Sequence, residues 1–205
     1  MGAIIKTPDE IQKMRVAGKL AAQVLDMIGE YVVKGVTTDE LNTICHNYIV
    51  DVQEGIPAPL NYGHPPFPKS VCTSVNHVIC HGIPSDKKLK DGDSVNIDVT
   101  VIKDGYHGDS SKMFVVGKPS ILTERLIKVT QECLYKAIEI VKPGTTLGDI
   151  GHIIQQLNQR LQGLSAHQAM QVSKQQLAIN QAALNQTFAG LRLAKRYGIQ
   201  QLPSI

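Results

Sequence analysis

The sequence lacks a long hydrophobic run, a signal peptide and a dense set of cysteines. No stretch approaches the roughly 18 consecutive apolar residues that a membrane-spanning helix requires. The first fifteen residues contain no charged segment followed by an apolar one, which argues against secretion. The four cysteines are scattered along the chain, so a disulfide-stapled scaffold is not expected. We therefore predict a cytoplasmic protein with reduced thiols and no membrane association.

Acidic residues are missing from the last quarter of the chain. All 18 Asp and Glu residues lie at or before Asp149, whereas residues 151–205 carry five Lys or Arg side chains and 12 of the 16 glutamines. This change of composition predicts a boundary near residue 150. With 42% hydrophobic residues overall, the chain has enough apolar side chains for a folded core. The sequence also lacks P-loop, GxGxxG, CxxC, GxSxG and HExxH motifs, which removes the commonest nucleotide-binding, redox and zinc-peptidase interpretations.

The pattern of the residues that are present predicts an α+β fold. Thr7 and Thr37 each begin a capping box with a glutamate three residues later, which is typical of a helix N-terminus. Apolar runs separated by turn residues indicate a central β-region, and a loop with five prolines precedes it at 55–69. The predicted helices cover 8–34, 38–48, 123–141 and 153–197, the last being long and rich in glutamine. The predicted strands cover 70–76, 78–83, 94–103 and 106–116.

Asp104 and Gly105 predict a two-residue turn between the last two strands, because this dipeptide suits the positive φ angles of a tight hairpin. Pairing the strands around that turn matches residues whose numbers sum to 209. Asp109 then lies opposite Thr100 and shares a face of the sheet with Asp98. Two carboxylates at that spacing can bind a pair of divalent cations. The alternatives are a solvated hairpin face and an ion pair with a Lys or Arg side chain.

His81 ends a predicted strand beside the proline-rich loop, a position that suits contact with a substrate or proton transfer. Cys80 precedes it on the strand and points to the opposite face, which argues against a thiolate–imidazole dyad of these two residues. Tyr62, Phe67 and Cys72 are candidates for an apolar pocket near the histidine. The alternative interpretation is a histidine bound to a backbone carbonyl, together with three ordinary core side chains.

Seven segments between residues 5 and 114 form a recognisable set of motifs. They are Ile5-Lys6-Thr7-Pro8, Met14-Arg15-Val16-Ala17-Gly18, Pro68-Lys69-Ser70-Val71-Cys72, Cys80-His81-Gly82-Ile83-Pro84, Asp91-Gly92-Asp93, Asn96-Ile97-Asp98-Val99-Thr100-Val101 and Gly105-Tyr106-His107-Gly108-Asp109-Ser110-Ser111-Lys112-Met113-Phe114. Together they resemble the N-terminal half of bacterial type I methionine aminopeptidases, which are pita-bread metallopeptidases. The resemblance covers residues 4–155. It predicts a half-domain of that fold over 1–155 and a foreign helical segment over 156–205, which weakly resembles thioredoxin-like and conjugative-element proteins.

The resemblance implies a role for each candidate residue. Asp98 and Asp109 are two of five ligands to a dinuclear centre of Co, Mn or Fe, with Asp109 bridging the ions. The resemblance makes His81 the residue that contacts the scissile amide of the substrate. Thr100, which faces Asp109 in the predicted pairing, is predicted from that pairing as a supporting residue. The pocket for the initiator-methionine side chain is lined by Tyr62, Phe67 and Cys72.

The same resemblance implies removal of the initiator methionine from nascent peptides by metal-dependent hydrolysis. It also implies one His and two Glu ligands from a C-terminal half, and residues 151–205 contain no carboxylate side chain. We therefore expect weak metal binding and no turnover by this chain alone, unless a complementing C-terminal half or self-association completes the site. The alternative is a non-catalytic binding or assembly module, or a chimeric or truncated product. Nucleic acid is not an expected partner, because few aromatic residues lie among the basic residues of the tail.

Overall fold

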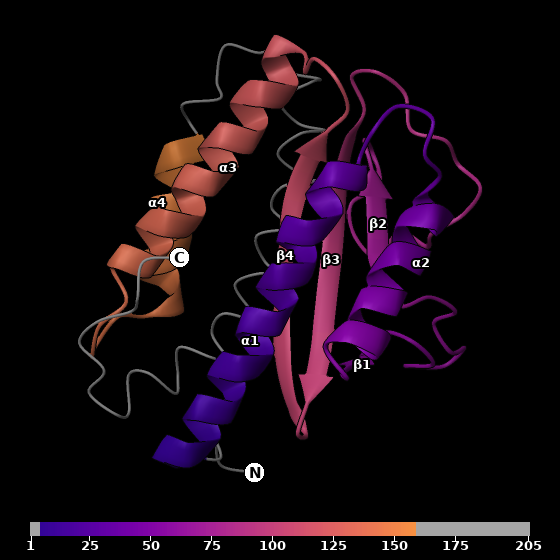
Figure 1. The fold of residues 1–205 in the computed structure, drawn as a ribbon. Helices are drawn as coiled ribbons and strands as arrows, with labels where there is room; N and C mark the ends of the chain where they lie inside the picture. Colours follow the sequence, from indigo (N-terminus) through magenta and orange to yellow (C-terminus); the bar gives the residue numbers. More distant parts are fainter. Residues whose placement is uncertain (1–4, 159–205) are drawn as a thin grey trace. The chain divides into compact units, whose positions relative to one another are not determined.

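The computed structural model describes residues 5–158, which fall into two compact units: 7–123, and a helical unit that contains 124–158 (Figure 1). The helices are α1 (Pro8–Ile28), α2 (Thr38–Asn47), α3 (Ile121–Glu139) and α4 (Leu147–Asn158). The strands are β1 (Ile56–Pro57), β2 (Cys72–Val75), β3 (Ser94–Lys103) and β4 (Tyr106–Val115). A 3-10 turn (Gly29–Tyr31) follows α1, and a π-helical turn (Tyr48–Val52) follows α2. The predicted α+β class with an antiparallel sheet is confirmed.

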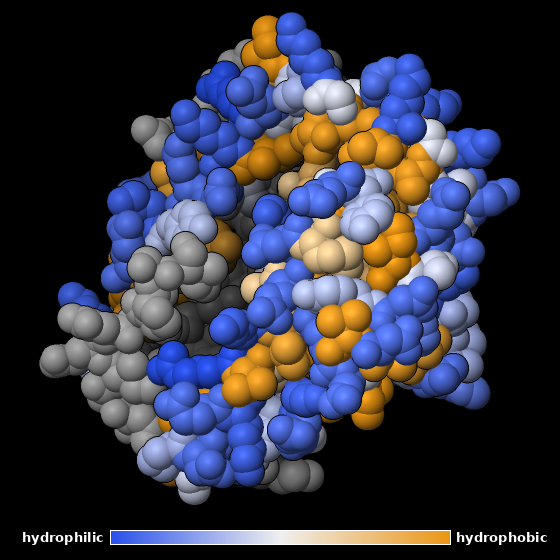
Figure 2. Space-filling model, in the orientation of Figure 1, coloured by the Kyte–Doolittle hydropathy of each residue, from blue (hydrophilic) through white to orange (hydrophobic). Residues whose placement is uncertain are grey.

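The first two helices begin where their capping boxes predict. The Thr7 hydroxyl accepts a hydrogen bond from Glu10 N at 3.3 Å, and the Glu10 carboxylate accepts one from Thr7 N at 2.7 Å. Thr37 and Glu40 repeat this arrangement at the start of α2, with distances of 3.1 and 2.7 Å. Each box satisfies backbone donors that the first helical turn leaves unpaired, which stabilises the helix start by about 1 kcal/mol. The outward side of α1 is mostly hydrophilic (Figure 2), as expected for an amphipathic helix at the surface.

Strand β3 is the centre of a four-stranded antiparallel sheet. β4 pairs with it along its whole length, while β2 and β1 pair with different parts of its other edge. The β3–β4 register places Lys103 opposite Tyr106, so the predicted sum of 209 is confirmed. The turn residues Asp104 and Gly105 have φ angles of +52° and +81°, which a two-residue hairpin of this type requires.

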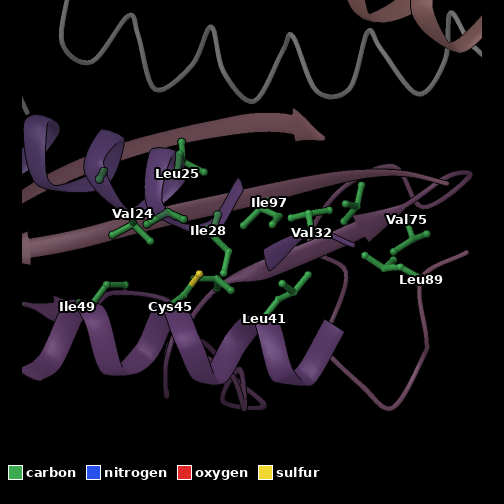
Figure 3. Close-up of a cluster of buried hydrophobic side chains, with 14 of the residues drawn as sticks. Val24, Leu25, Ile28, Val32, Leu41, Cys45, Ile49, Val75, Leu89 and Ile97 are labelled. Atoms are coloured by element: carbon green, nitrogen blue, oxygen red, sulfur yellow. The ribbon is translucent and has the colours of Figure 1, made fainter. Parts of the chain in front are cut away.

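The core of the first unit lies between one face of this sheet and helices α1 and α2 (Figure 3). Alternate residues of β3 are fully buried in it, namely Val95, Ile97, Val99 and Val101. Buried aliphatic side chains of this size each contribute about 1.5–3 kcal/mol of hydrophobic stabilisation. Gly108 lets α1 approach β4 closely, because a Cβ atom at this position would overlap the carbonyl of Ala17. Since this face of the sheet belongs to the core, the intervening residues of β3 point to the other face.

Helices α3 and α4 form a second unit around a small core of their own. Its buried side chains are Val129, Cys133, Ala137, Ile150 and Ile154. The Asp149 carboxylate accepts a hydrogen bond from Thr146 N at 2.7 Å, which caps the start of α4. None of the described helices is long and apolar enough to cross a membrane. The predicted helix over 153–197 overlaps the end of α4, and its part beyond residue 158 lies outside the described residues.

The predicted strand over 78–83 is wrong. This segment contains no strand and meets β2 through two backbone hydrogen bonds, from Val78 N to Val75 O at 3.2 Å and from Thr73 N to Gly82 O at 2.8 Å. His81 has a φ of +53°, which turns the chain out of the extended conformation that continued pairing requires. The segment is therefore an irregular return along the outer edge of β2.

Candidate metal centre

Polar side chains gather on the face of the sheet that points away from α1 and α2. Directly opposed residues of antiparallel strands share a face. Asp98 lies opposite Cys72 of β2 and Ser111 of β4, and Thr100 lies opposite Asp109 of β4. Asp98 and Thr100 alternate with the buried core residues of β3. We call this surface the site face and define it by Cys72, Asp98, Thr100, Asp109 and Ser111.

Asp98 and Asp109 lie diagonally across the β3–β4 pairing, with their carboxyl groups within hydrogen-bonding reach of each other. Burial raises the pKa of Asp98 to about 6. Burial and the neighbouring charge of Asp98 raise the pKa of Asp109 to about 6, and the Thr100 hydroxyl partly offsets this rise. Two carboxyl groups this close repel each other when both are ionised. The pair therefore favours a bound cation or a shared proton.

One oxygen of the Asp109 carboxyl, Oδ1, is buried and has no hydrogen-bond partner. An unpaired buried acceptor costs about 1–3 kcal/mol, and a divalent cation bound to that oxygen removes the cost. The two carboxylates therefore fit a centre for divalent metal ions, which accept carboxylate oxygens as ligands. Within residues 5–158, no group of three or more His, Cys, Asp or Glu side chains could hold a metal ion. This part of the chain thus supplies only part of a ligand set.

The predicted pocket residues lie in two places. Tyr62 and Phe67 belong to the proline-rich loop, where Phe67 N donates a hydrogen bond to Tyr62 O at 2.8 Å. Tyr62 is 78% exposed and Phe67 is half-buried. Cys72 is buried opposite Asp98, and burial, followed by the charge of that carboxylate, raises the pKa of its thiol to about 12. The structure thus brings Cys72 to the metal candidates, whereas a methionine pocket shared with Tyr62 and Phe67 stays a prediction.

His81 lies in the irregular segment that follows β2. Its side chain is exposed, and the next residue, Gly82, accepts the hydrogen bond from Thr73 N. This bond places His81 beside the edge of β2 that faces away from β3. Its predicted contact with a substrate stays a prediction.

Sequence reasoning missed two polar residues of the same face, Ser74 and Asn96, which lie opposite each other on β2 and β3. Ser74 is 5% exposed, and its hydroxyl accepts a hydrogen bond from Gly82 N at 3.2 Å. Asn96 donates from Nδ2 to Ser111 Oγ at 3.4 Å. The alternation of strand residues would have found both, because Ser74 is two residues from Cys72 and Asn96 is two residues from Asp98.

The profile of metallopeptidase family M24 matches residues 12–195 of the chain. The chain belongs to metallopeptidase family M24. Membership accounts for the pita-bread α+β fold with its antiparallel sheet, and it implies divalent metal ions as cofactors. The carboxylate pair of this M24 chain is chemically suited to such ions.

Relatives of this M24 chain include bacterial methionine aminopeptidases. The chain is 62% identical over 156 residues to methionine aminopeptidase of Escherichia coli strain K12, a match that covers 76% of this chain and 58% of the relative. It is 58% identical over 151 residues to methionine aminopeptidase of Rickettsia prowazekii strain Madrid E, which covers 74% of this chain and 57% of the relative. The crystal structure of the R. prowazekii methionine aminopeptidase aligns with a TM-score of 0.74 and 54% identity, covering 78% of this chain and 63% of that one. This M24 chain therefore spans less than two thirds of the length of these relatives.

The similarity of fold extends to more distant proteins. Prolidase from Pyrococcus furiosus is 23% identical to this chain with a TM-score of 0.65, which shows a shared fold alone. The family match continues to residue 195, whereas the match to the E. coli relative covers 156 residues. The domain boundary expected at residue 155 stays a prediction.

Proposed function

We propose that this chain is part of a methionine aminopeptidase, which removes the N-terminal methionine from nascent peptides in the cytoplasm. The observation that carries the proposal is the Asp98–Asp109 pair, because Asp109 Oδ1 is buried without a partner. The proposal is supported by the 62% identity to a methionine aminopeptidase over 156 residues.

Asp98 and Asp109 would hold divalent metal ions of the Co, Mn or Fe type through their carboxylate oxygens. When bound, such ions polarise a peptide carbonyl and lower the pKa of a hydrolytic water. Thr100 would orient the Asp109 carboxyl through its hydroxyl, which already interacts with that group. Burial of both carboxyl groups would exclude competing water from the ligand oxygens.

The remaining candidate residues are proposed to bind the substrate. Tyr62, Phe67 and Cys72 would surround the methionine side chain. Burial raises the pKa of the Cys72 thiol to about 12, so this residue stays neutral and suits an apolar pocket. His81 would donate a hydrogen bond to the scissile amide, and its exposed side chain leaves it accessible to a peptide.

The 205-residue chain by itself is proposed to bind metal weakly and to release no methionine. The part that the structure describes contains no group of three metal-binding side chains, and residues 151–205 contain no Asp or Glu. With two carboxylates alone, water fills most of the coordination positions of the metal ions. The affinity of the chain for metal is then low, and the ions are not held in one place. The proposed half-domain, 1–155, would then need further ligands from a complementing polypeptide.

A binding or assembly role is the second candidate, and the edge of the sheet favours it. Among residues 5–158, β4 pairs only with β3. The backbone donors and acceptors on the outer edge of β4 are therefore open to a further strand from outside this part of the chain. A complementing C-terminal half or a second copy of the chain would supply it.

Hydrolysis of Met-Ala-Ser by the purified chain, with Mn(II) or Co(II) added, tests the proposal. We expect no methionine release from the chain alone. We expect release once the part of the E. coli relative that this chain does not match is added as a separate polypeptide. Asp98→Ala should abolish that release, while Asp51→Ala, which changes an exposed acid outside the sheet, should preserve it. Release that survives Asp98→Ala would overturn the proposed metal site.

A further inference from the structure

Gly82 forms two hydrogen bonds with β2, one as an acceptor and one as a donor. Thr73 N donates to Gly82 O at 2.8 Å, and Gly82 N donates to Ser74 Oγ at 3.2 Å. The first bond extends the sheet in the ordinary way, from backbone to backbone. The second uses a side chain of β2, so the direction of the Gly82 N–H depends on the identity of residue 74.

The contact at Gly82 leaves no room for a side chain. A Cβ atom at this position would overlap the carbonyl of Thr73 and would lie 3.1 Å from Ser74 Cα. The backbone of residue 82 therefore rests directly on the backbone of β2. A contact this close has little freedom to shift, so it fixes the peptide group between His81 and Gly82.

His81 adopts a left-handed backbone conformation, with a φ of +53°. Residues other than glycine adopt this conformation infrequently, and neighbouring contacts must hold them in it. The His81 side chain is exposed, so packing does not set the direction of its ring. The direction of the His81 ring therefore depends on its backbone conformation, and the nearest fixed contact of that backbone is at Gly82.

Ser74 connects this conformation to the site face. It lies opposite Asn96, two residues along the same strands from the Cys72–Asp98 pair, and only 5% of it is exposed. We infer that Ser74 is a positioning residue: its hydroxyl, by accepting the Gly82 N–H, holds His81 in the left-handed conformation at the outer edge of β2. This inference rests on the proposed function for the part His81 plays with substrate.

Nuclear magnetic resonance of the full chain tests the inference, through two signals of His81. The one-bond coupling between 13Cα and its proton reports a positive φ without any metal. Broadening of the His81 ring signal by added Mn(II) reports how close the ring lies to the metal candidates. Ser74→Ala should lose the positive-φ coupling and the ring broadening, while broadening at the Asp98 and Asp109 amides persists. Ser111→Ala, which removes a hydroxyl from the same face away from Gly82, should keep the positive-φ coupling of His81, which needs no metal.

A second variant covers the case in which Ser74→Ala fails to fold. Gly82→Ala keeps the Ser74 hydroxyl but forces the segment off β2, so it should also lose the positive-φ coupling. A His81 coupling that stays unchanged in folded Ser74→Ala would overturn the role of Ser74, and one that stays unchanged in folded Gly82→Ala would overturn the role of the close contact at Gly82. If Mn(II) fails to broaden the Asp98 and Asp109 amides of the unmodified chain, the metal part of the proposed function fails, and the metal-free coupling still decides the role of Ser74.

Discussion

Thr100 lies directly opposite Asp109 in the β3–β4 pairing. Burial raises the pKa of the Asp109 carboxyl, and the Thr100 hydroxyl opposes that rise by hydrogen bonding to the charged form. Thr100 thus positions the carboxylate of Asp109, which is proposed to bind metal. It follows from the hairpin register, which a two-residue turn fixes.

Thr100→Val should weaken Mn(II) binding by about 10-fold, since the loss of a group that orients a metal ligand typically costs this much. Valine keeps the shape of the side chain and removes only the hydroxyl. Titration calorimetry of the chain with Mn(II) measures the change. Thr100→Ser should restore the affinity, because it keeps the hydroxyl. Equal affinities of Thr100→Val and the unmodified chain would show that the hydroxyl does not orient Asp109.

The metal-free chain should lose stability as pH rises through the range set by the carboxylate pair. Burial raises the pKa of Asp98 from 3.8 to about 6 in the folded state. Between pH 3.8 and about pH 6, Asp98 keeps its proton in the folded chain but has released it in the unfolded chain. The protonated carboxyl therefore contributes fully to the free energy of unfolding below pH 3.8, and this contribution is lost above about pH 6. Asp98→Asn removes this dependence. Its free energy of unfolding relative to the unmodified chain should therefore increase from pH 4 to pH 7.

Urea unfolding in the presence of EDTA measures that difference. Asp51→Asn is the matched control, because it changes an exposed carboxyl far along the chain from the pair. The difference in free energy of unfolding between Asp51→Asn and the unmodified chain should vary less with pH than the difference for Asp98→Asn. If the two variants give the same pH profile, the raised pKa of the pair is refuted.

Gly108→Ala should destabilise the first unit by about 3 kcal/mol, the upper part of the range for overpacked sites. A Cβ atom there would overlap the backbone of α1 at Ala17, and neither backbone can move without disturbing the core. Gly18→Ala is the matched control on α1, because a Cβ atom at Gly18 has nothing within 4 Å. That change should stabilise the helix by up to about 1 kcal/mol. Thermal unfolding followed by circular dichroism measures the stability of both variants. Similar changes for Gly108→Ala and Gly18→Ala would argue against a close approach of α1 to β4 at Gly108.

One of the four thiols should react quickly with Ellman's reagent. Cys80 is exposed, whereas Cys45, Cys72 and Cys133 are buried. Burial also raises the pKa of all three buried thiols, to about 12 for Cys45 and Cys72, so little thiolate forms at them near neutral pH. Cys80→Ser should remove the fast phase, and Cys72→Ser should leave it unchanged. More than one fast thiol per folded chain would contradict the burial of these residues.

Much of the first unit could be predicted because the signals are local. Each capping box is complete within four residues, and both boxes begin helices where the sequence places them. The register of β3 and β4 follows from Asp104 and Gly105 alone, because a two-residue turn permits one pairing of the strands. Since side chains alternate along a strand, that register also determines which residues share a face with Asp98.

The sequence by itself therefore determined the helix starts, the hairpin and the pairing of Asp109 with Thr100. Only the tertiary structure decided that Asp109 Oδ1 is buried without a partner, because burial depends on strands and helices distant in sequence. It also decided that residues 78–83 are not a strand. Their apolar residues favour an extended chain, but the close contact of Gly82 with β2 and the left-handed backbone of His81 override that preference. Local propensity amounts to tenths of a kcal/mol per residue, so a contact between backbones that meet only in the folded chain outweighs it.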